Sequence, residues 1–108
     1  MKKELSEYHS IYLIGIGGAS MYAIAAMLKN DGKTIMGSDM QESDNTRYLE
    51  SIGVPVTIGH NIDAIKNADL VIYTAAIADD DVELVCAREN NIECVERAVF
   101  LGEYTKQY

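Results

Sequence analysis

A glycine turn at residues 15–18 is the part of this sequence best suited to chemistry. Gly15, Gly17 and Gly18 follow the apolar run Ile11–Ile14, and an Ala-rich segment with helical periodicity comes directly after them. The order strand, turn, helix leaves backbone N–H groups unblocked at a helix N-terminus, where a phosphate can bind. We expect Gly15 to make the tight turn, Gly17 to let a phosphate approach and Gly18 to open the helix.

Other polar residues follow the next apolar runs. Asp39 ends the second run, where an acid holds a ribose diol in dinucleotide-binding folds, although a turn or cap role also fits. Ser20 occupies the place of the third glycine in the G-x-G-x-x-G pattern, and this weakens the dinucleotide interpretation. His60 follows the third run, and its type alone allows a ligand contact or a merely structural place. Residues 79–81 are all aspartate, and we interpret them as a helix cap rather than a metal cluster.

Residues for catalysis are missing from the pattern. The sequence has no G-x-x-x-x-G-K-[ST] loop, and no Ser/His/Asp set or carboxylate pair stands out. Cys86 and Cys94 lack C-x-x-C spacing and are expected to be small buried apolar residues. The residues thus predict a nucleotide-binding module with no catalytic residue and no metal site of its own, and a ligand-free turn remains the alternative.

The elements that must position these residues alternate strictly. Apolar patterns predict strands at 11–14, 33–37, 54–58, 69–73 and 92–95, separated or followed by helices near 21–30, 43–52, 63–66, 82–90 and 98–104. Such a chain is α/β, with a Rossmann-like five-stranded parallel sheet in the order 3-2-1-4-5 and helices on both faces. Ligands of these sheets bind beyond the carboxyl ends of the strands, which here collect residues 15–20, 38–39, 59–60 and 74–77.

Length and charge limit the class of protein. The 108 residues suit one domain, and the formal net charge of −8 argues against nucleic acid or an anionic membrane as partner. No apolar run approaches the roughly 18 residues of a membrane span. The two lysines at the N-terminus are not followed by the apolar segment that a secretory signal would have. We therefore expect a cytoplasmic location.

Five motifs occur in order and together resemble a known family. They are His9–Met21 around the glycine turn, Gly37–Asp39, Gly59-His60, Thr74–Ile77 and Arg97-Ala98. The combination is similar to the N-terminal domain of the Mur ligases, from about Tyr8 to Tyr104. In that family this domain binds the UDP moiety of UDP-N-acetylmuramic acid rather than NAD.

The resemblance implies which residues contact the ligand. Gly15 to Ala19 would line the diphosphate, with Thr74 to Ile77 on its other side, and Asp39 with Ser38 would approach the uridine. His60 would lie near the uracil or ribose. The full set is Gly15, Gly17, Gly18, Ala19, Ser20, Met21, Ser38, Asp39, His60, Thr74, Ala75, Ala76 and Ile77. Two positions depart from the family pattern: Ser20 replaces the last loop glycine, and Val99 replaces an acid after Arg97-Ala98.

The resemblance also implies a larger enzyme. Family members have a central domain that binds ATP and Mg²⁺ and a C-terminal domain that receives the amino acid, so residues 1–108 would be an inactive N-terminal fragment that needs no cofactor itself. The closest pattern is that of members that add L-alanine in peptidoglycan biosynthesis. The alternatives are the related ligase that recycles murein tripeptide, an NAD(H)-binding regulatory or redox domain, and a free-standing nucleotide sensor.

Overall fold

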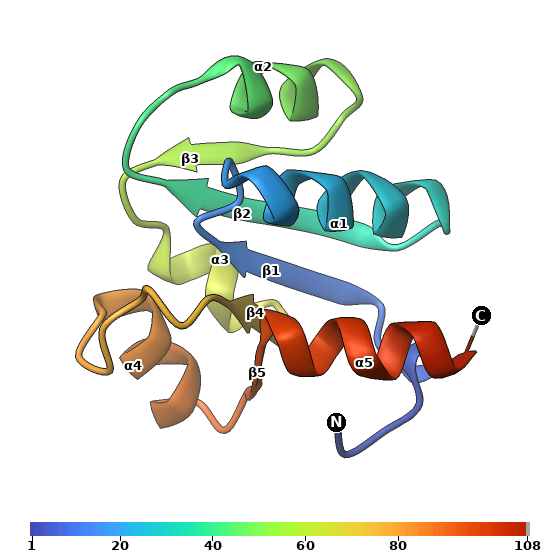
Figure 1. Cartoon of the computed structure of the whole chain (residues 1–108). Coiled ribbons are helices and arrows are strands. Elements are labelled where there is room, and N and C mark those ends of the chain that lie inside the picture. Colours follow the sequence, from blue (N-terminus) through green and yellow to red (C-terminus); the bar gives the residue numbers. More distant parts are fainter. Residues whose placement is uncertain (108) are drawn as a thin grey trace.

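A five-stranded parallel sheet forms the centre of the molecule (Figure 1). The computed structural model describes residues 1–107; Tyr108, where the expected domain ends, lies outside them. The strands are β1 (Ser10–Ile14), β2 (Thr34–Asp39), β3 (Val56–Ile58), β4 (Leu70–Tyr73) and β5 (Glu93–Glu96). Their order in the sheet is β3-β2-β1-β4-β5, so the predicted fold class and strand order are confirmed.

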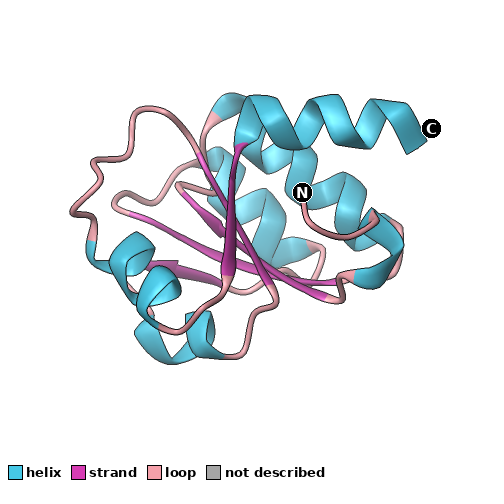
Figure 2. Cartoon of the chain, turned by 90° about the horizontal axis from the view of Figure 1, so that it is seen from below, coloured by secondary structure: helices cyan, strands magenta, loops and turns pink. Residues whose placement is uncertain are grey.

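Helices cover both faces of this sheet (Figures 1 and 2). One face carries α1 (Ala19–Asn30), α2 (Asp44–Ser51) and α5 (Arg97–Gln107), with a 3₁₀ turn, η1 (Leu5–Glu7), beside α5. The other face carries α3 (Ile62–Lys66) and α4 (Val82–Glu89). The result is the three-layer arrangement in which a sheet of this kind hides both of its surfaces.

Strand β1 shows why its sequence is apolar throughout. Ile11 and Leu13 point into the core under α1, α2 and α5, whereas Tyr12 and Ile14 point into the core under α3 and α4. All four side chains are at most 3% exposed. Because both faces of a central parallel strand are covered, its sequence does not alternate between apolar and polar residues.

The structure corrects some details of the elements. Strand β3 begins at Val56 rather than at residue 54, since Pro55 has no N–H to donate to a neighbouring strand; its predicted edge position is confirmed. In α4, Val82 is 52% exposed although it is apolar, whereas Leu84 is fully buried. Helix η1 was not predicted. Cys86 is buried, as expected, whereas Cys94 is only half-buried; both are free thiols.

Candidate functional site

The glycine turn after β1 is bonded to the end of β2. Gly15 has a φ of +78°, the left-handed conformation that a tight turn requires of it. The backbone N–H groups of Gly15 and Ile16 both donate to the carbonyl oxygen of Ser38 at 2.9 Å. The carboxyl ends of β1 and β2 are thereby held together, and the turn lies at the sheet edge where the sequence placed it (Figure 1).

Gly17 permits a close approach, but of the protein to itself. A Cβ atom there would lie 2.8 Å from Thr46 Cγ2 and 2.9 Å from Asp39 Oδ2. The Gly17 N–H donates to Asp39 Oδ2 at 2.9 Å, and its carbonyl accepts from Asn45 Nδ2 at 2.9 Å. The space on the Cβ side of Gly17 is filled by Asp39 and the first turn of α2, and the predicted approach of a phosphate to Gly17 stays a prediction. Asn45 was missed, because an asparagine in a first helical turn carries no distinguishing signal.

Asp39 uses both carboxylate oxygens, one for the glycine turn and one for the loop that follows β2. Besides the bond from Gly17, its Oδ1 accepts from the Gln41 N–H at 3.2 Å. Each oxygen of an ionised carboxylate has a second lone pair. A ribose hydroxyl can therefore still donate to Asp39, and the expected sugar contact stays a prediction.

The N-terminus of α1 has free backbone donors. Its N-cap residue, Gly18, makes no side-chain cap bond, whereas Ser43, Asn61 and Asp81 cap α2, α3 and α4. The first amide of α1 to close a helical turn is that of Tyr22, which donates to the Gly18 carbonyl at 3.0 Å. The three N–H groups before it, at residues 19–21, have no carbonyl within the helix to bond. Such groups bind anions.

Ser20 and Met21, two of these three residues, can offer different groups to a ligand. Ser20 is exposed, so a serine in place of the family's glycine meets no steric obstacle. Met21 is 1% exposed and packs in the core, so it can offer a ligand only its backbone N–H. Val99, the other departure, lies 53% exposed on α5.

A pocket of about 170 Å³ opens beside the turn. Five of the predicted site residues line it: Gly15, Ser38, Asp39, His60 and Ile77. The other lining residues are Ile14, Met40, Gly59, Asp81 and Glu83. An apolar cavity of about 150 Å³ is enough to hold a benzene molecule. The pocket thus has room for one six-membered ring.

The remaining predicted residues lie outside that pocket. Residues 17–21 form the turn and the start of α1, and residues 74–76 form the turn after β4, which the Ile77 N–H closes onto the Thr74 carbonyl at 3.0 Å. Ala75 and Ala76 are exposed. The structure therefore places the predicted residues along one edge, in a pocket and in two flanking turns.

Glu83, like Asn45, was missed in the sequence analysis. It is 1% exposed, and its carboxylate accepts hydrogen bonds from the Tyr12 hydroxyl, the Ser38 hydroxyl and the Asn61 N–H. Burial and the hydrogen bond to Glu83 raise the pKa of Tyr12 well above its usual value. An acid in the first turn of a helix is ordinary, so nothing in the sequence distinguished Glu83 from its aspartate neighbours.

One of those aspartates acts as the predicted helix cap. Asp81 caps α4, accepting from the N–H groups of Glu83 and Leu84 at 2.9 and 3.2 Å. Within residues 1–107, no three His, Cys, Asp or Glu side chains are grouped so that they could hold a metal ion.

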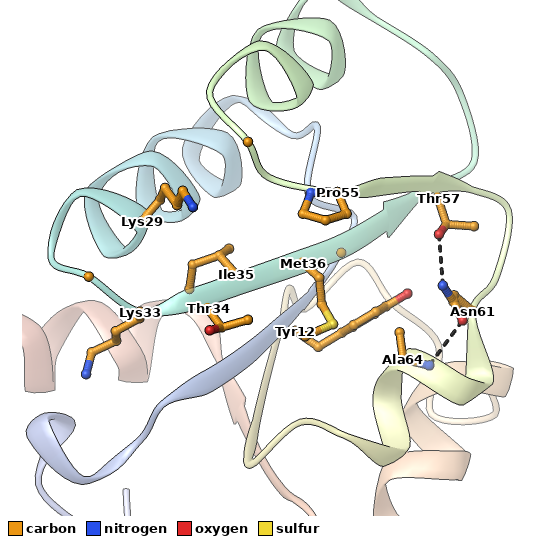
Figure 3. Close-up of a pocket in the computed structure, with 13 residues that line it drawn as sticks. Tyr12, Lys29, Lys33, Thr34, Ile35, Met36, Pro55, Thr57, Asn61 and Ala64 are labelled. Atoms are coloured by element: carbon orange, nitrogen blue, oxygen red, sulfur yellow. Dashed lines mark hydrogen bonds between the residues drawn. The ribbon is translucent and has the colours of Figure 1, made fainter.

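A larger pocket of about 390 Å³ lies along β2 (Figure 3). Lys29, Lys33, Thr34 and Pro55 are among its lining residues, and it contains none of the residues predicted to contact UDP. It is therefore separate from the candidate site.

Sequence comparisons place these features in a family. Residues 10–108 match the model described as "Mur ligase family, catalytic domain". A UDP-N-acetylmuramate–L-alanine ligase of Clostridium novyi is 51% identical over 92 residues, which are 85% of this chain and 20% of the relative. The enzyme of that name from Caldicellulosiruptor saccharolyticus is 51% identical over 100 residues, or 93% of this chain and 22% of the relative. The chain spans about a fifth of the length of these relatives.

Comparison with solved structures finds the same fold. The crystal structure of a UDP-N-acetylmuramate–alanine ligase from Thermotoga maritima matches with a TM-score of 0.87 at 33% identity, covering 94% of this chain and 23% of that one. A murein peptide ligase from Psychrobacter arcticus shares the fold, with a TM-score of 0.74 at 24% identity over 81% of this chain and 18% of that one. Among residues 1–107, no helix has both the length and the apolar character needed to cross a bilayer.

Proposed function

The chain belongs to the Mur ligase family, and from this premise we propose that it is the UDP-binding domain of a ligase that adds L-alanine to UDP-N-acetylmuramate. One observation carries the proposal. Gly15 belongs both to the turn that opens the uncapped helix α1 and to the pocket that has room for a single ring. A diphosphate at the amides of residues 19–21 and a uracil in the pocket would thus lie at neighbouring parts of one edge.

The charges around this edge of the sheet indicate which groups would bind the diphosphate. No Lys or Arg lines the pocket, and the chain has a formal net charge of −8. Backbone N–H groups at the start of α1 must therefore supply most of the attraction. Hydrogen bonds to a charged acceptor are worth about 1.5–3 kcal/mol each, so two or three of them suffice for a moderate affinity.

The domain's contribution to catalysis would be to position the substrate. Holding the UDP end fixes where the muramoyl carboxylate lies, and fixed geometry removes much of the entropic cost of reaction. ATP with Mg²⁺, bound by a central domain, would activate that carboxylate as an acyl phosphate for attack by the amine of L-alanine. This part of the proposal, like the cytoplasmic location and the three-domain parent, rests on the family alone. Residues 1–108 by themselves should not catalyse this reaction.

Calorimetric titration of the 108-residue chain tests the proposal. UDP-N-acetylmuramic acid and UDP should bind, and NADH should not. In Gly17→Ala, the new Cβ meets Thr46 and Asp39 and should displace the turn, so UDP affinity should fall at least tenfold. Gly102→Ala is the matched control, because nothing lies within 4 Å of a Cβ there.

Three results would contradict the proposal. Tighter binding of NADH than of UDP would favour the redox or regulatory alternative. Equal UDP binding by Gly17→Ala and the wild type would separate the turn from the ligand. Formation of UDP-N-acetylmuramoyl-alanine by the isolated chain with ATP would show that the chemistry does not need further domains.

A further inference from the structure

The buried carboxylate of Glu83 joins segments that approach the pocket from different strands. Its Oε2 accepts from the Tyr12 hydroxyl and, at 2.9 Å, from the Asn61 N–H, while its Oε1 accepts from the Ser38 hydroxyl. Figure 3 shows the Tyr12 side chain running along the sheet with its hydroxyl toward the segment of Asn61, which caps α3. Three donors on one carboxylate leave little of its acceptor capacity unused.

His60 also lies close to that carboxylate. Its Nδ1 is 3.6 Å from Glu83 Oε1, a distance within ion-pair range and too long for a hydrogen bond. The His60 side chain is 39% exposed and lines the pocket, whereas Glu83 is 1% exposed. The backbone of the next residue, Asn61, is itself bonded to Glu83, so the histidine is held near the carboxylate by the chain as well.

We infer that Glu83 fixes the tautomer of His60, and that the pocket thereby selects uracil over cytosine. A negative carboxylate beside Nδ1 favours the proton on that nitrogen. In the neutral ring, Nε2 is then left as a hydrogen-bond acceptor. This inference rests on the proposed function, because the group that meets Nε2 is the base of the bound nucleotide.

The chemistry of the two pyrimidines makes the choice. Uracil carries an N–H at ring position 3, which can donate to an acceptor such as Nε2. Cytosine carries a lone pair at the same position, so it would face His60 Nε2 acceptor to acceptor. A site that matches a donor rejects a ligand lacking it far more strongly than a site that only fills space. Glu83 is in this sense a positioning residue and His60 the residue that reads the base.

Glu83→Gln should change His60 Nε2 from a hydrogen-bond acceptor into a donor. The Oε2 position accepts two donors, so the amide oxygen of the glutamine should take that place and its NH₂ group should face Ser38 and His60. An NH₂ group donates to Nδ1, which moves the ring proton to Nε2 and turns the acceptor into a donor. The matched control is Glu93→Gln: Glu93 accepts from the Tyr8 hydroxyl at the opposite end of the sheet, so the same change occurs far from the pocket.

Nitrogen-15 NMR of the ligand-free 108-residue chain at pH 8 gives the first readout. The wild type and Glu93→Gln should show His60 with its proton on Nδ1, and Glu83→Gln with its proton on Nε2. His9, the other histidine, serves as internal reference. A proton on Nε2 in the wild type, or an unchanged tautomer in Glu83→Gln, would overturn the inference. Should Glu83→Gln fail to fold, the wild-type tautomer decides.

Calorimetric titration with UDP and CDP gives the second readout. The wild type and Glu93→Gln should prefer UDP at least tenfold, the preference should vanish in His60→Ala, and it should turn toward CDP in Glu83→Gln. Equal affinities for UDP and CDP in the wild type, or an undiminished preference in Glu83→Gln, would refute the selectivity. If the wild type binds neither nucleotide, the proposed function fails and the selectivity with it, while the NMR result still decides whether Glu83 sets the tautomer.

Discussion

Gly37→Ala should be the most informative single substitution for the architecture of the site. Gly37 lies in the middle of β2, directly beneath the glycine turn. A Cβ atom there would meet the Leu13 carbonyl oxygen on β1 and would lie 2.7 Å from Ile16 Cδ1 and 2.9 Å from Ile16 Cβ. Ile16 is the fully buried residue of the turn, so the new methyl group would push the turn away from the sheet.

The expected cost follows from these contacts. Forcing a methyl group into a well-packed core costs about 1–3 kcal/mol, and the clash with backbone at Leu13 places Gly37→Ala at the upper end. Removing a glycine from a strand returns about 0.5–1 kcal/mol. The net loss should be about 2 kcal/mol. With a urea m-value of about 1–1.5 kcal/mol/M for a domain of this size, the unfolding midpoint should fall by about 1.3–2 M.

Urea unfolding followed by circular dichroism measures this loss. Gly102→Ala is the control, since it makes the same chemical change inside α5 with nothing within 4 Å of the new Cβ. It should be stabilised by about 0.8–1 kcal/mol, the helix preference of alanine over glycine. A Gly37→Ala chain as stable as the wild type would show that β1, β2 and the turn are not packed as tightly as the structure has them.

Three further predictions concern other parts of the chain. Burial and the hydrogen bond to Glu93 raise the pKa of Tyr8 to about 12, while an unfolded tyrosine ionises near pH 10. Stability should therefore be intact below pH 10 and fall as the pH rises through 12, and Tyr8→Phe should flatten that decline in urea titrations; an equally steep decline would refute the assignment. Burial also raises the pKa of the Cys94 thiol, so iodoacetamide at pH 8 should alkylate it far more slowly in the folded chain than in urea, and equal rates would contradict its burial. Ser43→Ala removes the capping box that Ser43 forms with Thr46 and should cost about 1 kcal/mol of unfolding free energy, whereas no change would mean that α2 begins without it.

Local patterns were enough to predict most of the scaffold. The apolar run of β1 and the glycines after it define a strand and a turn through near neighbours only, and the φ of Gly15 agrees. The same holds for Ser43 and Asp81, whose side chains cap the helices that follow them directly. Strand order could be predicted because right-handed crossovers leave few arrangements for alternating strands and helices.

Contacts between distant residues could not be predicted in this way. Gly17 and Asp39 were both singled out, yet their bond to each other was not, because it depends on how β1 and β2 meet. Glu83 was missed for the same reason. Its partners Tyr12 and Ser38 are 71 and 45 residues away in the chain, and no spacing rule joins them.

The sequence by itself thus determined the fold and the strand order, its motifs indicated the family, and it predicted the edge of the sheet at which a nucleotide would bind. The fold and the strand order follow from periodicity, turn residues and helix caps, which act over a few residues. Only the tertiary structure decided that Asp39 braces the turn, that Met21 is buried in the core, and that Glu83 lies beside His60. Those facts depend on which side chains meet once five strands are side by side, and such meetings have no signature along the chain.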